Sequence, residues 1–256
     1  MLNVESRNGV LFVTINRPEV RNAFNDELIA KLHDTFRDPA PDIRAIVIRG
    51  EGPAFCAGGD LQWMAKAANY TEEENREDAL KLANMLNALV NCPVPSIALV
   101  HGAAFGGGCG LVAASDIAIA VDGTKFAFSE VRLGLVPATI SMFVVPKIGQ
   151  GNARALFSTG EAFDAADALR IGLVHSLVTT PEELKGVLDY KLQAILNAGP
   201  RSVARSKQLA LSVPKSLNEA AQVLAEARSG DEGKEGVAAF LEKRKASFTA
   251  KWEGYE

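Results

Sequence analysis

Four short apolar runs, separated by long connections, restrict the fold more than any other feature of the chain. They read VLFVTI (10–15), IRAIVIRG (43–50), PSIALV (95–100) and DIAIAV (116–121). Runs of this kind are typical of strands buried on both faces, as in a parallel sheet covered by helices. The connections are long enough for crossovers, so the alternation predicts right-handed βαβ units and an α/β fold.

Capping residues mark where helices begin between these strands. Asn25 precedes a segment whose Leu28 and Phe36 fall at helical spacing, and Thr71 with Glu74 forms a capping box. The helix after Thr71 has an apolar face made of Leu82, Met85, Leu86 and Leu89. Further along, DAADALRIG predicts a helix that ends at Gly172, and TPEEL predicts one with Thr180 as its cap.

The last 60 or so residues read as helical, without a strand of their own. Ser216 and Glu219 form a second capping box, and EGVAAFLEKRKASF (235–248) is amphipathic. Such a segment cannot bury itself, so it must pack on the core or on another subunit. We therefore expect an α/β core over residues 1–195 and a C-terminal helical segment over 196–256.

Composition excludes several classes of protein. The chain has 256 residues, a net charge of −4, scattered basic residues, three cysteines and three histidines. Phosphate binding needs a concentrated basic surface, so no nucleic-acid partner is expected. The cysteines fit neither a disulfide framework nor a zinc site, and no metal is expected. The apolar stretch 93–121 is broken by two prolines, five glycines and Asp116, so we expect a reduced cytoplasmic protein without a membrane partner.

Five glycines lie within nine residues directly after the strand at 95–100, from Gly102 to Gly110. Glycine weakens a packed region, so something must need bare backbone there. The cluster opens an alanine-rich helical stretch, and a glycine turn before a helix presents backbone amides to an anion. Neither the dinucleotide pattern G-x-G-x-x-G nor the P-loop pattern can be aligned on these glycines.

A second glycine loop, GPAFCAGGDLQWM (52–64), follows the strand at 43–50 in the same way. Gly58 and Gly59 precede Asp60, which is placed to cap the following helix. Both loops would lie at one edge of the sheet, where open α/β sheets bind ligands. One amide from each could form an oxyanion hole for a carbonyl oxygen that becomes negatively charged. Alternatively, both loops are tight turns that allow close packing of helix on strand.

Six ordered segments resemble the crotonase (enoyl-CoA hydratase/isomerase) superfamily. They read NRPEVRNAFN, FCAGGDL, HGAAFGGGCGL with SDIAIA, FAFSEVRLGLVP, STGEAFDAADALRIGLV and EGVAAFLEKRK. The resemblance covers nearly the whole chain. It implies a core built as a spiral of repeated ββα units with a C-terminal helical trimerisation segment. It also implies acyl-CoA thioesters as ligands, with coenzyme A as part of the substrate and no separate cofactor.

The resemblance also assigns site residues. The oxyanion donors would be the amides of Gly59 and Gly107. The coenzyme A groove would be lined by Val20, Arg21, Ala23, Ala57, Gly58, Gly59, Asp60, Leu61 and Gly107. Phe240 and Lys243 are expected to contact coenzyme A, with the chain assembled as a homotrimer or hexamer. Candidates for an acyl pocket are Trp63, Met64, Phe105, Gly110, Met142 and Phe143, although such residues are more often simply core.

Carboxylates decide which reaction such a site performs. Hydratases of the superfamily typically use two glutamates, and this chain has Gly110 at the first of these positions and Glu130 at the second. The apolar surroundings of Glu130 predict a raised pKa, which suits general acid–base catalysis. Alternatively, Glu130 pairs with Arg132 on the surface. Cys109 in the glycine loop lacks a histidine–acid partner, and His33, His101 and His175 read as structural.

The expected activity is hydration of a 2-enoyl-CoA, or the reverse dehydration, with Glu130 as acid and base. Among bacterial hydratases, GGGCGLVAA and SEVRLGLVPATIS most resemble those acting on methylglutaconyl-CoA or carboxygeranoyl-CoA type substrates, which implies a branched or carboxylated acyl group. A double-bond isomerase is the alternative, since moving one proton between two carbons needs a single carboxylate. A third reading is an acyl-CoA-binding protein without catalysis.

Overall fold

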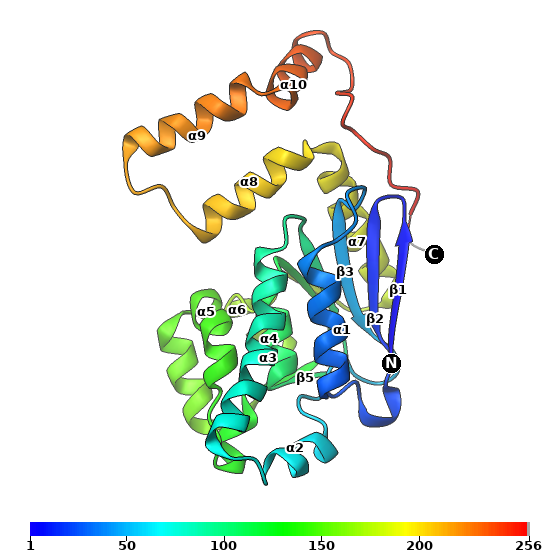
Figure 1. The fold of residues 1–256 in the computed structure, drawn as a ribbon. Coiled ribbons are helices and arrows are strands. Elements are labelled where there is room, and N and C mark those ends of the chain that lie inside the picture. Colours follow the sequence, from blue (N-terminus) through cyan, green and yellow to red (C-terminus); the bar gives the residue numbers. More distant parts are fainter. Residues whose placement is uncertain (255–256) are drawn as a thin grey trace.

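A six-stranded sheet forms the centre of the chain in the computed structural model, which describes residues 1–254 apart from the side chain of Pro181 (Figure 1). Its strands lie in the order β1 (Leu2–Arg7), β2 (Val10–Ile15), β3 (Ala45–Gly50), β4 (Ser96–Val100), β6 (Ile117–Val121) and β9 (Ser176–Val178). All neighbours are parallel except β1 and β2. The four apolar runs are therefore strands of one mostly parallel sheet, as predicted.

Alternate residues of each central strand face two different hydrophobic cores. In β3, Ile46 and Ile48 belong to the larger core, whereas Ala45 and Val47 belong to the smaller one. The larger core is covered by α1 (Asp26–Arg37), α3 (Glu72–Asn91), α4 (Gly107–Ala114) and α5 (Ala138–Thr159). The smaller core is covered by α7 (Pro181–Asn197). Burial on both faces explains why these strands read as continuous apolar runs.

A small second sheet lies next to the glycine loops. It consists of β5 (Ala103–Phe105), β7 (Lys125–Ala127) and β8 (Ala162–Asp164), with β5 parallel and β8 antiparallel to β7. Three phenylalanines hold it together, because Phe126 stacks on Phe163 at 5.7 Å between ring centroids and Phe128 contacts the same ring. The remaining elements of the core are η1 (Pro18–Val20), α2 (Leu61–Ala67), η2 (Ser129–Leu133) and α6 (Ala165–Arg170).

The hydrogen bonds at the helix starts confirm the predicted caps at Asn25 and Thr71 and correct the one at Ser216. Asn25 Oδ1 accepts from the Leu28 amide at 2.9 Å, and Thr71 with Glu74 forms the full capping box. Ser216 Oγ accepts from the Glu219 amide at 3.1 Å, but the Glu219 carboxylate accepts from the Lys215 amide rather than from that of Ser216. The prediction of a second full capping box is therefore wrong in its reciprocal half, because the carboxylate reaches one residue further back.

The C-terminal helices α8 (Pro200–Leu211), α9 (Leu217–Ser229) and α10 (Asp231–Leu241) follow the core, and α9 and α10 stand apart from it (Figure 1). Gly199 offers no side chain to cap α8, and Glu232 supplies one from α10 by accepting from the amides of Arg201 and Ser202 at 3.0 and 2.7 Å. The predicted amphipathic segment 235–248 is helical only as far as Leu241. Lys243 then takes a left-handed conformation with φ 56°, which turns the chain.

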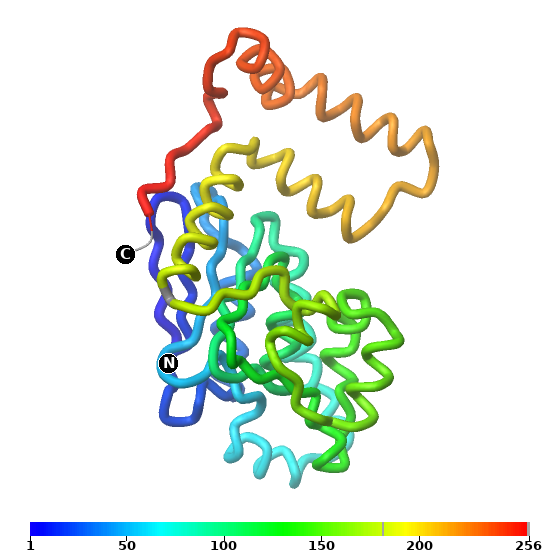
Figure 2. The backbone as a smooth tube through the Cα atoms, turned by 180° about the vertical axis from the view of Figure 1, so that it is seen from behind, coloured from blue at the N-terminus to red at the C-terminus, as the bar shows by residue number. Residues whose placement is uncertain are grey.

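The last described residues run back to the N-terminal strands, as seen from behind in Figure 2. Arg44 donates to the carbonyls of Ala198 at 2.6 Å and Phe248 at 3.1 Å, which holds the departing and returning chain together. Trp252 is buried in the smaller core, 6.1 Å from Phe12 between ring centroids, and its indole N–H donates to Asp189 at 2.6 Å. Within residues 1–254 no helix combines the length and the apolar character needed to cross a membrane.

We expect Trp252→Ala to lower the free energy of unfolding by about 3–5 kcal/mol, because it removes a buried ring and leaves a cavity. Urea denaturation followed by circular dichroism measures this loss. Tyr190→Ala is the matched control, since Tyr190 lies on α7 with 71% of its surface exposed and should change stability by less than about 0.5 kcal/mol. Equal effects of the two substitutions would contradict an anchoring role for Trp252.

Candidate active site

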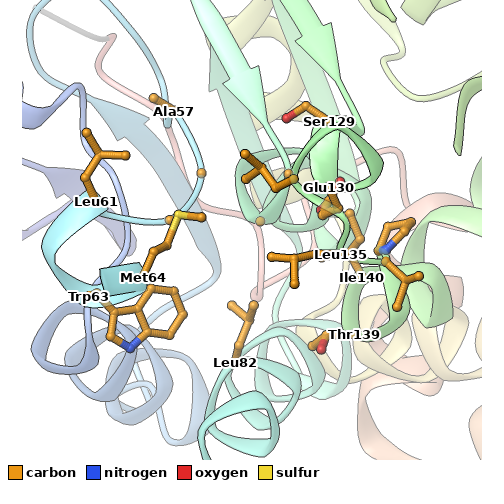
Figure 3. A pocket seen from close by; sticks show the side chains of 17 residues that line it. Ala57, Leu61, Trp63, Met64, Leu82, Ser129, Glu130, Leu135, Thr139 and Ile140 are labelled. Atoms are coloured by element: carbon orange, nitrogen blue, oxygen red, sulfur yellow. The ribbon is translucent and has the colours of Figure 1, made fainter. Parts of the chain in front are cut away.

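A cavity of about 400 Å³ lies where the two glycine loops meet η2 and the first turn of α5. Gly59, Gly107 and Glu130 all line it. Leu61, Trp63 and Met64 form one side, and Glu130, Leu135 and Ile140 lie across from them, with Leu82 between the two sides (Figure 3). The structure thus brings the three residues predicted to be catalytic to one space.

The two glycine loops are joined by backbone pairing. The Cys56 amide donates to Ala103 at 3.1 Å, and the Phe105 amide donates back to Cys56 at 3.0 Å. The approach leaves no room for side chains, since a Cβ on Gly102 would lie 1.9 Å from the Pro53 carbonyl oxygen, and one on Gly108 would lie 2.5 Å from that of Cys56. Part of the glycine cluster therefore serves the contact between the loops, as the packing alternative predicts.

Gly59 lies in an extended segment whose backbone hydrogen bonds go to Phe24 on one side. The Phe24 amide donates to Gly58 at 2.7 Å, and the Asp60 amide donates to Phe24 at 2.8 Å. In such a parallel bridge the groups of the middle residue point the other way, so the N–H of Gly59 faces away from Phe24. No protein acceptor for this N–H exists among the described residues.

Gly107 is the first residue of α4, so its N–H has no acceptor within the helix. The chain turns into the helix at Gly106, whose φ is 49° and whose own amide donates to Ala127 at 2.9 Å. A Cβ on Gly107 would lie 3.0 Å from the Phe24 ring. Over the part of the chain that the structure describes, the Gly107 N–H also lacks a protein acceptor, and the positive end of the α4 dipole adds to its affinity for an anion.

Glu130 lies in η2 with its carboxyl group half-buried at the wall of the cavity. Its Oε2 is buried without a hydrogen-bond partner among the described residues, and its Oε1 lies 3.2 Å from where a Cβ on Gly106 would be. Burial raises the pKa of Glu130, as the apolar sequence around it predicts. The alternative of a surface pair is wrong, because Glu130 is half-buried, Arg132 has no effect on its pKa and no ion pair joins the two among the described residues; the Arg132 side chain contacts Gly160 instead.

The loop that carries Gly59 is held by a buried ion pair. Arg17 donates to Asp60 at 2.7 Å, and Asp60 also accepts from the Gln62 amide at 2.8 Å, which caps α2. Burial alone raises the pKa of Asp60, but the bonds from Arg17 and Gln62 outweigh it and leave that pKa lowered. Asn22 is fully buried and donates to the carbonyls of Glu51 and Ala54. The segment 17–24 therefore braces this loop from outside.

Only some residues predicted to bind substrate line the cavity. Ala57, Gly58, Gly59, Leu61 and Gly107 do. Val20, Arg21 and Ala23 lie in the bracing segment 17–24, and Asp60 is bound to Arg17. Arg21 contributes through its backbone carbonyl, which accepts from the Ala57 amide at 3.0 Å. Phe240 and Lys243 lie at or just beyond the end of α10, at the opposite end of the molecule from α2 (Figure 1).

Of the acyl-pocket candidates, Trp63 and Met64 line the cavity and the other four do not. Met142 points to solvent with 72% of its surface exposed, and Phe143 packs against the larger core. The backbone of Phe105 is paired in β5, and its carbonyl faces Gly58. Gly110 is buried within α4, where a Cβ would lie 2.6 Å from Ile140 Cγ2. Ile140 thus occupies the space that a side chain at position 110 would need.

Most of the wall was not predicted from the sequence. The missed residues are Leu82, Gly106, Ser129, Leu133, Leu135, Val136, Pro137, Thr139 and Ile140. For all of them except Leu82 and Gly106, the signal is the run SEVRLGLVPATI, in which η2 and the start of α5 flank an exposed apolar loop. Exposed leucines and valine beside a candidate carboxylate are a surface that a ligand can cover.

The remaining reactive side chains have structural partners. Cys109 is buried and its thiol donates to the Ala104 carbonyl at 2.9 Å, and burial raises the pKa of this thiol, so the structure gives no support to a thiolate nucleophile. Nε2 of His101 lies 2.9 Å from the Gly52 carbonyl oxygen, and Nδ1 of His175 accepts from the Ala118 amide. His33 lies beside Asp34 on α1. All three histidines lie outside the cavity.

Comparisons with known proteins place this geometry in a family. Residues 5–251 match the family described as enoyl-CoA hydratase/isomerase. The chain is 33% identical over 260 residues to the crotonyl-CoA hydratase of Syntrophomonas wolfei, and the matched region covers 98% of each of the two chains. It is 31% identical over 265 residues to the trans-2-decenoyl-acyl-carrier-protein isomerase of Streptococcus mutans, covering 95% of this chain and 96% of that one.

The fold agrees with solved structures of such proteins. An enoyl-CoA hydratase from Shewanella pealeana superposes with a TM-score of 0.91 and 35% sequence identity, covering 96% of this chain and 95% of that one. The expected fold class, including the C-terminal helices, is therefore confirmed.

We expect Glu130→Gln to make the protein more stable at neutral pH. The folded state raises the pKa of Glu130, so the folded chain holds its proton more tightly than the unfolded chain, and wild-type stability falls as pH rises through the raised value. The advantage of the variant should therefore appear above that pKa and vanish below the ordinary value of 4.5. Thermal melts between pH 4 and pH 8 measure it, and a pH-independent difference would contradict the buried-carboxylate account.

A second expectation concerns the contact between Gly110 and Ile140. Gly110→Ala should destabilise by about 1–3 kcal/mol through overpacking, and Ile140→Ala by about 2–5 kcal/mol through a cavity. The double variant should lose less than the sum, because the added methyl group fills part of that cavity. Gly186→Ala in α7, where a Cβ meets nothing within 4 Å, is the control and should be neutral or stabilising.

Proposed function

Because the chain belongs to the enoyl-CoA hydratase/isomerase family, we propose that it adds water reversibly to the double bond of a 2-enoyl-CoA thioester. The observation that carries the proposal is the convergence of Gly59, Gly107 and Glu130 on one cavity. Two N–H groups and one carboxylate oxygen, none with a protein partner among the described residues, belong to residues that line this cavity, and most of its other side chains are apolar. Polar groups left unpaired at one place are typical of a site completed by its substrate.

In the proposed hydration, the thioester oxygen accepts hydrogen bonds from the amides of Gly59 and Gly107. The Glu130 carboxylate takes a proton from water while the water oxygen forms a bond to C3. The electron pair of the double bond moves toward the thioester and gives an enolate held by the two amides. Protonated Glu130 then delivers the same proton to C2, which yields the 3-hydroxyacyl thioester and restores the carboxylate.

One carboxylate is enough for this sequence because the proton that it gains is the proton that it returns. A second carboxylate at position 110 has no space beside Ile140, so this chain would work without the partner that two-glutamate hydratases use. The raised pKa of Glu130 supports the role, since a group that is easily protonated passes its proton on readily.

Isomerisation is the second candidate, and the same feature favours it. With a 3-enoyl-CoA, Glu130 would take the C2 proton and return it to C4, and no water is needed. The isomerase from Streptococcus mutans is 31% identical to this chain, close to the 33% of the crotonyl-CoA hydratase. The Glu130 variant also separates both reactions from the third reading, an acyl-CoA-binding protein without catalysis.

Coenzyme A would lie along the loop 57–61, with the segment 20–23 bracing that loop from behind. Phe240 and Lys243 lie far from the cavity of their own chain, so any contact with coenzyme A would be to that of a neighbouring subunit. The exposed apolar side chains of Leu217, Phe240 and Leu241, at 90, 82 and 73% exposure, support the expected assembly into trimers or hexamers.

We expect Glu130→Gln to lower kcat/KM for crotonyl-CoA hydration by about 10²–10⁴-fold, because the amide can neither take nor return the proton. Wild-type kcat/KM should fall as pH drops through the raised pKa of Glu130, since protonation removes the base. Loss of the enoyl-thioester absorbance measures hydration, and gain of that absorbance from 3-hexenoyl-CoA measures isomerisation.

Arg132→Gln is the control for this experiment, because it changes a charge in the same short helix on a side chain that lies against Gly160. It should keep nearly full activity. Unchanged turnover in Glu130→Gln would remove Glu130 from the mechanism. Turnover of neither substrate by the wild type, with binding of their thioesters retained, would favour the protein without catalysis.

A further inference from the structure

The charge of the cavity wall restricts the acyl group more tightly than its shape does. Seventeen residues line the cavity, and Glu130 is the only charged residue among them. None is a lysine, arginine or histidine. Apart from the indole of Trp63, the hydroxyls of Ser129 and Thr139 are the only other polar side-chain groups in the wall.

Basic side chains on elements beside the cavity have contacts outside it. Arg17 is buried in its ion pair with Asp60, and Arg132 lies against Gly160. Lys66 on α2 lies 3.9 Å from Asp26, and Lys81 on α3 lies 3.8 Å from Asp78. No lysine, arginine or histidine of the described residues lines the cavity, so none is held there to neutralise an anion.

The apolar wall also changes in exposure from its inner to its outer part. Ile140 is 2% exposed and Leu82 is part-buried, so the inner wall has little contact with solvent. Leu135, Leu133 and Val136 at the rim are 53, 63 and 71% exposed, and Leu61 opposite them is 81% exposed. A ligand that leaves the inner wall meets aliphatic side chains that are in contact with water.

From these observations we infer that the cavity selects an uncharged aliphatic acyl group and rejects one that ends in a carboxylate within the inner wall, in contrast to the carboxylated acyl group that the sequence resemblance implies. This inference rests on the proposed function, because it takes the cavity to hold the acyl part of a CoA thioester. A carboxylate there would lose its hydration without gaining a cation, and it would share the cavity with the Glu130 carboxylate. A methyl end in the same place only adds buried apolar area.

The same reasoning makes the selection depend on chain length. In a short acyl group the terminal carboxylate falls between Leu82 and Ile140, where it cannot be hydrated. In a long one the carboxylate passes the rim of Leu133 and Val136 and stays in water, while its methylene chain covers the exposed side chains. Discrimination against a terminal carboxylate should therefore weaken as the acyl group becomes longer.

The test compares matched pairs of substrates with the wild-type enzyme. We expect kcat/KM for trans-2-hexenoyl-CoA to exceed that for the CoA monothioester of trans-2-hexenedioic acid by roughly 100-fold or more. For the ten-carbon pair the ratio should shrink to less than roughly tenfold. Equal values for the six-carbon pair, or a preference for the diacid, would overturn the inference.

Leu135→Arg places a cation at the wall and should reduce the six-carbon discrimination at least about tenfold. Leu135→Gln removes apolar area from the wall without adding a charge and should keep the discrimination. Leu169→Arg adds the same charge on α6, outside the cavity, at a residue with 40% exposure, and should also keep it. Loss of discrimination in all three variants would contradict an effect of charge at the wall.

Binding of saturated thioesters separates this inference from the proposed reaction. Hexanoyl-CoA should bind more tightly than the CoA monothioester of hexanedioic acid, again by roughly 100-fold in Kd measured by calorimetry. If neither enoyl thioester is turned over and this ratio still holds, the proposed reaction is wrong and the selection by charge stands. If turnover occurs and the two saturated esters bind equally, the selection by charge is wrong and the reaction stands.

Discussion

The backbone pairing between the loop 51–60 and β5 is the contact on which the candidate site depends. It brings together two loops that follow different strands of the large sheet, and it requires glycine at 102 and 108 because carbonyl oxygens occupy the space of a side chain. With the loops in contact, Gly59 and Gly107 both reach one cavity although 48 positions separate them in the chain. Among the described residues their N–H groups have no protein acceptor, and the proposed hydration would use both to bind the thioester oxygen.

Electrostatically, the cavity is an apolar space with one titratable group. Burial disfavours the charged form of Glu130, and no basic side chain of the described chain offsets this effect. Keeping the Glu130 carboxylate charged in this environment lowers the stability of the folded chain. The same environment raises the proton affinity of Glu130, which suits acid–base chemistry. Ile140 maintains this state by filling the place where a second carboxylate would have to enter.

Sequence reasoning predicted the parts of the molecule in which local pattern and tertiary environment agree. Strands buried on both faces, the caps at Asn25 and Thr71, and the glycine loops belong to this class. It missed β5, β7 and β8, because a three-residue strand is too short to show a period, and β1, whose residues are mostly exposed. It misplaced Met142 and Phe143 because residue type says nothing about which way a helix face points, and α5 turns Ile140 rather than these two toward the site.

The guanidinium of Arg44 has a consequence for the C-terminal arm. By binding the carbonyls of Ala198 and Phe248, it joins the two ends of an excursion that contains α8, α9 and α10. The C-terminal arm, residues 198–248, is thus closed at its base, because both of its ends bind Arg44, the residue directly before β3. Doubling the length of a flexible closed loop costs only about 0.6 kcal/mol in entropy. A longer turn between these helices therefore adds little to the entropic cost of closing the arm, and the sheet keeps its register.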